Sequence, residues 1–135
     1  MTLEFFVPGK PATAGSKRAF LSKTTNKMVV KHDNPRHAEW RRMVRSEARE
    51  KMSGEPLIDG PVRMHVIFWM KRPGSPSIKK RPYPIVTPDL DKMVRAINDA
   101  LTGVVFKDDS QVVVQRAEKF YGETPGARVR VEEMA

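Results

Sequence analysis

The chain has 135 residues, with 25 Lys and Arg against 16 Asp and Glu, a net charge of +9 at pH 7 and no cysteine. This length suits one domain with a modest hydrophobic core. The absence of cysteine excludes disulfide scaffolds, Cys-ligated zinc sites, iron–sulfur clusters and thiol nucleophiles. No apolar run approaches the about 20 residues of a membrane span, and no secretory signal is visible. We therefore expect a cytoplasmic protein without a membrane partner.

The positive charge is concentrated in the first two thirds of the chain. Residues 1–88 carry 18 Lys and Arg against 7 Asp and Glu, whereas residues 89–135 carry 7 against 9. A strongly basic surface favours nucleic acid as the partner, because neutralising phosphates releases counterions. Two basic segments, about residues 9–34 and 71–88, are rich in Pro, Gly, Ser and Thr and are predicted to be loops that bind DNA or, alternatively, only solvated connections. Their candidate DNA-binding residues are Lys10, Lys17, Arg18, Lys23, Lys27, Lys71, Arg72, Lys79, Lys80 and Arg81.

The N-terminal half predicts a strand, a long basic loop, a helix and a second strand. Residues 2–8 form the first strand, which ends at a Pro-Gly pair. Asp33-Asn34-Pro35 is a helix start signal, and residues 35–52 carry apolar side chains at helical spacing opposite a charged face. Residues 61–70 alternate between apolar and polar and become apolar on both faces at their end, which predicts a central strand.

The C-terminal half predicts a helix and two further strands. Residues 90–102 carry an apolar stripe at helical spacing and are followed by Gly103, a common helix terminator. After a short apolar stretch and a turn at residues 107–110, strands are expected at residues 111–121 and 127–132. The order β, α, β, α, β, β predicts a single α+β domain over the whole chain, with a small mixed β-sheet flanked by two main helices.

Four carboxylates after residue 88 are candidate metal ligands. Asp89 and Asp91 would point to nearly opposite sides of one helix, so they converge only if Asp89 is the N-cap and Asp91 lies in the first turn. Asp108 and Asp109 could join them if residues 104–106 run back beside the helix. Acids that meet in this way repel each other unless a cation is present. Mg²⁺ is the natural candidate, and it can activate water for attack on a phosphodiester.

Each of these acids also has a purely structural interpretation. Asp89 could be only an N-cap, Asp91 could pair with Arg95 at i, i+4, and Asp108 and Asp109 could form a turn. Two hypotheses follow from the residues: a metal-dependent nuclease, and a non-catalytic basic protein that binds nucleic acid.

Three segments resemble the RusA family of Holliday junction resolvases. They are Pro88-Asp89-Leu90-Asp91, Asn98-Asp99-Ala100-Leu101-Thr102-Gly103, and Val105-Phe106-Lys107-Asp108-Asp109-Ser110-Gln111-Val112. The resemblance is close over about residues 86–118. It implies a homodimeric α+β endodeoxyribonuclease that binds four-way DNA junctions and makes paired symmetric cuts with Mg²⁺, or Mn²⁺ in its place. Such proteins act in DNA recombination and repair, in bacteria or phage-infected cells, and are often carried by phages and prophages.

The resemblance also assigns roles to individual residues. It implies Asp89, Asp91 and Asp109 as catalytic and metal-binding acids, with Asp108 and Asp99 as supporting positions. The chain departs from the family at two positions, with Lys92 in place of the usual Asn and Arg95 in place of a functional Lys. Arg keeps the positive charge near the phosphate but does not readily release a proton. Either Lys92 or Arg95 could take the role of that Lys. A third hypothesis is a related nuclease that acts on flaps, forks or RNA.

Overall fold

The computed structural model of the protein describes residues 1–14, 17–21, 28–32, 36–74 and 79–135. Four of its strands form one mixed sheet in the order β1-β6-β4-β5. These are β1 (Thr2–Pro8), β4 (Val62–Lys71), β5 (Val112–Gly122) and β6 (Gly126–Glu133). β6 runs antiparallel to both β1 and β4, whereas β4 and β5 are parallel. The predicted α+β class with a small mixed sheet is confirmed.

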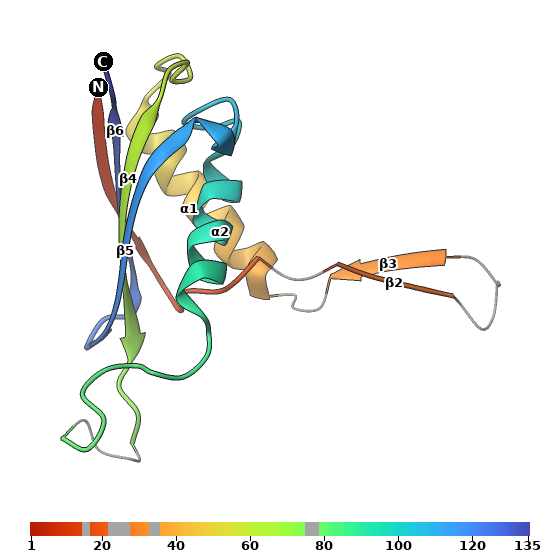
Figure 1. The fold of residues 1–135 in the computed structure, drawn as a ribbon, viewed down its shortest axis with the longest axis vertical. Coiled ribbons are helices and arrows are strands. Elements are labelled where there is room, and N and C mark those ends of the chain that lie inside the picture. Colours follow the sequence, from red (N-terminus) through yellow and green to blue (C-terminus); the bar gives the residue numbers. More distant parts are fainter. Residues whose placement is uncertain (15–16, 22–27, 33–35, 75–78) are drawn as a thin grey trace.

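Both main helices cover the same face of this sheet. They are α1 (Arg36–Met52) and α2 (Leu90–Leu101), and Figure 1 shows them stacked side by side on the sheet. A parallel strand pair needs a crossover connection, and α2 lies in the segment that connects β4 to β5. None of the described helices is long and apolar enough to cross a membrane.

β4 occupies the centre of the sheet, as its sequence predicts. It pairs with β6 on one side and with β5 on the other. Val62, Met64, Val66 and Phe68 are fully buried, because alternate residues of a strand face the same side and this side lies under the helices.

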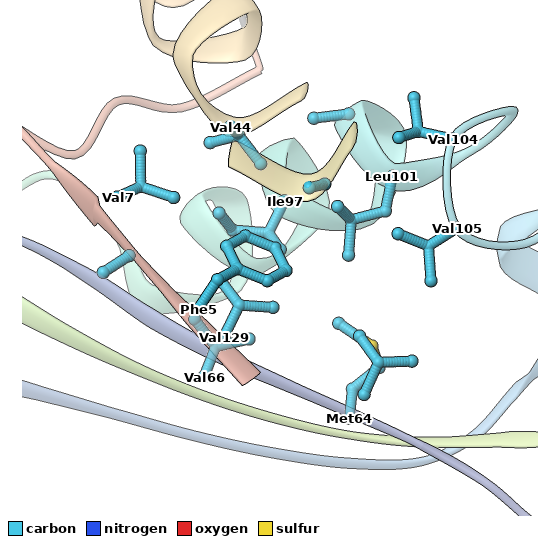
Figure 2. Packing of buried hydrophobic residues seen from close by; sticks show 14 of the residues in the cluster. Phe5, Val7, Val44, Met64, Val66, Ile97, Leu101, Val104, Val105 and Val129 are labelled. Carbon is cyan, nitrogen blue, oxygen red and sulfur yellow. The ribbon is translucent and has the colours of Figure 1, made fainter. Parts of the chain in front are cut away.

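The hydrophobic core fills the space between the sheet and the helices (Figure 2). Val44 of α1 and Ile97 and Leu101 of α2 point toward Phe5 and Val66 of the sheet. The apolar stretch after α2 also enters this core: Val104, Val105 and Phe106 are buried. It forms no strand and is held by short contacts such as the hydrogen bond from Ile58 N to Val105 O, 2.8 Å.

The prediction of a continuous loop over residues 9–34 was wrong for ten of its residues. β2 (Lys17–Leu21) and β3 (Met28–His32) pair antiparallel in a separate two-stranded sheet, which projects away from the body of the molecule in Figure 1. Each strand contains a run of apolar residues, several of them good strand formers, and the surrounding Lys, Ser and Thr residues obscured this pattern. The helix start signal at residues 33–35 and the candidates Lys23 and Lys27 lie outside the described residues.

The sheet face opposite the helices carries aromatic and charged side chains. Phe6 and Trp69 lie with their ring centroids 6.1 Å apart. His65 Nε2 lies 2.8 Å from Glu118 Oε2, which joins the parallel strands β4 and β5 through a side-chain contact. The hydrophobic core therefore lies on the helix side of the sheet, and the opposite face carries these aromatic and charged side chains.

Candidate active site

The start of α2 places the first two candidate acids as the sequence predicts. Asp89 is the N-cap residue in an extended conformation, and Asp91 lies in the first turn. The carboxylate of Asp89 makes no capping hydrogen bond, and its Oδ2 lies 3.3 Å from Nζ of Lys92. Capping therefore does not account for the Asp89 side chain, which sits exposed beside a cation at the end of the helix.

Lys119 of β5 holds the segment that leads into α2. Its Nζ donates hydrogen bonds to the carbonyl oxygens of Val86 and Pro88, each 2.9 Å long. These bonds fix the end of the proline-rich loop against the sheet, one residue before Asp89. Neither the charge pattern nor the motif segments single out Lys119, because β5 shows no alternation of buried and exposed residues.

A short 3-10 helix, η1 (Asp109–Gln111), carries the second pair of candidate acids. Asp108 caps it: its Oδ2 accepts hydrogen bonds from the backbone N and the hydroxyl group of Ser110. These hydrogen bonds lower the pKa of Asp108 below its ordinary value. The Asp108 carboxylate is thus engaged in local structure, which agrees with the structural interpretation of this residue.

Gln111 connects η1 to the loop before β4. Its Oε1 accepts from the backbone N of Lys107 and of Asp108, both at 2.9 Å. Its Nε2 donates to the carbonyl oxygens of Ile58 (2.8 Å) and Gly60 (2.9 Å). Gln111 belongs to the third motif segment, which assigns it no role; in the structure its amide bridges the segment carrying Asp109 to the loop before β4.

Asp109 contacts Asp99, which lies on the third turn of α2. The pKa of Asp99 is raised, first by burial and further by the neighbouring Asp109 carboxylate. The Nε of Arg95 lies 4.0 Å from Oδ2 of Asp99 and opposes this shift. Neighbouring carboxylates repel each other unless a proton or a cation lies between them, so this pair is a candidate position for a cation.

The candidate acids therefore lie at the two ends of α2. Asp89 and Asp99 are ten residues apart, which corresponds to about 15 Å along the helix axis. Residues 104–106 turn away after Gly103 (φ +83°) and bridge to Ile58 and Thr102, so Asp109 approaches Asp99 rather than Asp89. Within the described ranges, no group of three His, Asp or Glu side chains is close enough to hold one cation. Asp91 forms no ion pair with any residue that the structure describes; the expected pair of Asp91 with Arg95 is not present, and Arg95 lies 4.0 Å from Asp99 instead.

Several of the candidate DNA-binding residues gather around the start of α2. Lys10, Lys71 and Arg81 line a pocket of about 570 Å³ together with Asp89 and Lys92. Lys79 and Lys80 are exposed on the loop that leads to it. Lys17 and Arg18 belong to β2, whereas Lys23 and Lys27 are outside the described part of the chain.

The fold and the site define a small basic α+β protein with carboxylates spaced along one helix and cations around the start of that helix. A family model described as "Endodeoxyribonuclease RusA" matches residues 8–132, and the chain belongs to this family. It is also similar to "Uncharacterized protein YqaN" of Bacillus subtilis (strain 168), with 31% identity. The alignment is 142 positions long, gaps included, and covers 98% of this chain and 97% of that protein. The family predicted from the acid motifs is confirmed.

Proposed function

We propose that this protein is a Mg²⁺-dependent endodeoxyribonuclease that resolves four-way DNA junctions by paired, symmetric phosphodiester cleavage. The observation that carries the proposal is the match of residues 8–132 to the RusA endodeoxyribonuclease family. The net charge of +9 supports a DNA substrate. DNA recombination and repair are the processes that need such cleavage.

The contact between Asp99 and Asp109 supports a divalent cation site. The pKa of Asp99 is raised, first by burial and further by Asp109, so a cation between the two carboxylates would relieve their repulsion. Carboxylate oxygens suit Mg²⁺ and Mn²⁺. We propose that Asp109, with Asp99 beside it, holds a cation at the end of α2. Asp89 and Asp91 of the first family motif lie at the start of that helix, about 12–15 Å along its axis from Asp99, and we propose that they hold a cation there, while Asp108 is engaged in capping. A bound cation of this kind supplies an activated water and stabilises the leaving oxygen of the phosphodiester.

In this proposal Arg95 and Lys92 together replace the functional Lys of the family. The Arg95 side chain is 78% exposed beside the acid pair, and its planar guanidinium group suits bidentate contact with a phosphate. Lys92 lies beside Asp89, at the other end of the helix from the acid pair. Arg95 therefore binds the phosphate near the acids, and Lys92 balances the charge of Asp89 and contacts the backbone further along the strand.

The remaining basic residues contact the arms of the junction. Phosphate contacts position a protein on DNA without reading its sequence, which suits side chains on loops and on the projecting β2–β3 hairpin. A homodimer presents two sites related by a two-fold axis, and this symmetry matches paired cuts in a four-way junction.

The test offers the purified protein a synthetic four-way junction, a linear duplex and a flap, each with Mg²⁺ or with EDTA. We expect paired nicks at symmetric positions in the junction alone, and only with Mg²⁺. Asp109→Asn and Asp91→Asn should abolish these nicks. Glu55→Gln removes the same charge from an exposed position outside the site and should leave the cleavage rate unchanged.

The other outcomes contradict parts of the proposal. Cleavage of the flap in preference to the junction would indicate a related nuclease with another substrate. Binding without cleavage in either Mg²⁺ or Mn²⁺ would favour a non-catalytic DNA-binding protein. Normal cutting by both Asp variants would show that these residues do not hold the cation.

A further inference from the structure

The pocket of about 570 Å³ beside the start of α2 is separate from the acid pair at the other end of that helix. Its wall is built by the segment after β1, the first residue of α1, the ends of β4 and β5, the proline-rich loop and the start of α2. Its volume lies within the range of about 300–1,000 Å³ that is typical of pockets for small organic ligands. The pocket is therefore large enough for more than a single phosphate group.

The charge of the pocket favours an anionic group. Five cationic residues and one acid line the pocket. The acid is Asp89, and the cationic residues are Lys10, Arg36, Lys71, Arg81 and Lys92. Asp89 is itself paired with Lys92 at 3.3 Å. Lys10, Lys71 and Arg81 form no ion pair in the part of the chain that the structure describes, so their charges are available to an incoming phosphate.

The rest of the wall is apolar, which a phosphate alone does not require. Met70, Pro84 and Val86 contribute this surface, and Met70 and Pro84 are buried. Two lining residues, Tyr121 and Arg81, each have a buried polar atom, Oη and Nε, without a hydrogen-bond partner among the described residues. Unpartnered buried polar atoms are costly, so a ligand with an apolar face and polar edges suits this wall.

One side of the pocket is fixed before any ligand binds. Lys119 donates to the carbonyl oxygens of Val86 and Pro88 at 2.9 Å, and both of these residues line the pocket. The ligand therefore does not need to order this part of the loop, which lowers the free-energy cost of binding.

We propose that this pocket takes one unpaired nucleotide of the bound DNA, with its phosphate at the cations and its base against Met70, Pro84 and Val86. A nucleotide combines the anionic group and the flat apolar body with polar edges that the two parts of the wall require. Bases leave the stack most easily where pairing is interrupted, as at a branch point. The inference rests on the proposed function in one respect, namely that the substrate is DNA.

The experiment uses a duplex with one unpaired 2-aminopurine, the same duplex with an abasic residue at that position, and a fully paired duplex, all in EDTA to prevent cleavage. We expect wild-type protein to bind the unpaired base about 5-fold or more tighter than the abasic residue. We also expect it to protect 2-aminopurine from quenching by acrylamide. Thr13→Phe, which fills the pocket from its lining, should remove both the preference and the protection.

Two further variants complete the test. If Thr13→Phe fails to fold, as judged by its circular dichroism spectrum, Arg81→Gln tests the phosphate end of the pocket: it removes one lining cation and should weaken the binding of the unpaired-base and abasic duplexes alike, because both keep the phosphate. Lys51→Gln removes the same charge from the exposed C-terminal turn of α1, about 22 Å along that helix from Arg36, and should bind both duplexes as tightly as the wild-type protein does. Equal affinity of the wild-type protein for the unpaired base and the abasic residue would overturn the inference.

The inference and the proposed function fail in distinguishable ways. Junction cleavage in Mg²⁺ without base protection in EDTA would leave the nuclease standing and remove the nucleotide pocket. Base protection without cleavage of any DNA in Mg²⁺ or Mn²⁺ would support the pocket and contradict the nuclease.

Discussion

Gln111→Leu is the substitution that tests how the fold positions Asp109. Leu has a similar volume but removes all four hydrogen bonds of the Gln111 amide. The two bonds from Lys107 N and Asp108 N are exposed, and water can replace them. The two to the part-buried carbonyl oxygens of Ile58 and Gly60 are harder to replace.

The magnitude follows from those two part-buried bonds. A hydrogen bond contributes a net of about 0.5–1.5 kcal/mol, and more when the partner is left buried and unsatisfied. We therefore expect the free energy of unfolding, measured in urea, to fall by about 1–3 kcal/mol. Asp109 lies in the same short helix, and displacement of a catalytic group by about 1 Å can lower a rate about 100-fold. We expect Mg²⁺-dependent junction cleavage to fall by about 10-fold or more, with partial recovery at higher Mg²⁺ concentration.

The matched control is Gln115→Leu, four residues further along the chain. Gln115 is exposed, and its two side-chain hydrogen bonds are 3.2 Å long, so its loss should cost less than about 1 kcal/mol. Gln111→Glu gives a graded result, because its carboxylate accepts from the two backbone N–H groups but meets the Ile58 and Gly60 oxygens without a donor. Wild-type unfolding and wild-type cleavage by Gln111→Leu would refute the conclusion that Gln111 positions Asp109.

Three further predictions concern other parts of the molecule. Lys119→Met removes the two bonds that hold the loop before α2 and should speed tryptic cleavage within that loop, which mass spectrometry would locate; unchanged digestion would contradict this role. Mg²⁺ should raise the melting temperature of the wild-type protein, raise that of Arg95→Gln further and leave that of Asp109→Asn unchanged, and equal shifts in all three would remove the acid pair from the metal site. The hydrogen bond from His65 lowers the pKa of Glu118 below its ordinary value of 4.5. The ionised Glu118 carboxylate therefore stabilises the fold above pH 4.5, and this stabilisation is lost as the pH falls through the lowered pKa. The difference in unfolding free energy between wild type and Glu118→Gln should therefore shrink below pH 4.5, and a constant difference would contradict it.

The secondary structure was largely predictable because its signals are local. The strand at residues 2–8 and the helix at residues 90–102 were placed to within one residue of their observed ends, since alternation and helical spacing lie within a short window of sequence. The β2–β3 hairpin was missed because its strands are short and its basic and polar residues outweigh its apolar ones. Strand order was not predictable, since the position of β6 between β1 and β4 depends on contacts between distant segments.

The same difference between local signals and distant contacts decides which parts of the candidate site were predictable. Asp89 and Asp91 were placed correctly because Pro88 and the helical pattern after it are adjacent in the sequence. The contact between Asp99 and Asp109 depends on the path of residues 103–108, which the positive φ of Gly103 and the bonds of Gln111 determine together. Neither feature has a periodic signal, so the sequence alone could not show which acids meet.

The spacing of charges on α2 links metal binding to phosphate binding. Arg95 lies within 4.0 Å of Asp99, so its guanidinium group partly balances the acid pair that we propose as the metal site. A divalent cation on Asp99 and Asp109 would take over that balance and release Arg95 to contact a phosphate. Linkage is reciprocal, so DNA that engages Arg95 would in turn strengthen the hold of the acids on the cation. This coupling is the physical reason to expect opposite effects from Arg95→Gln, namely tighter binding of Mg²⁺ to the free protein and weaker binding of DNA.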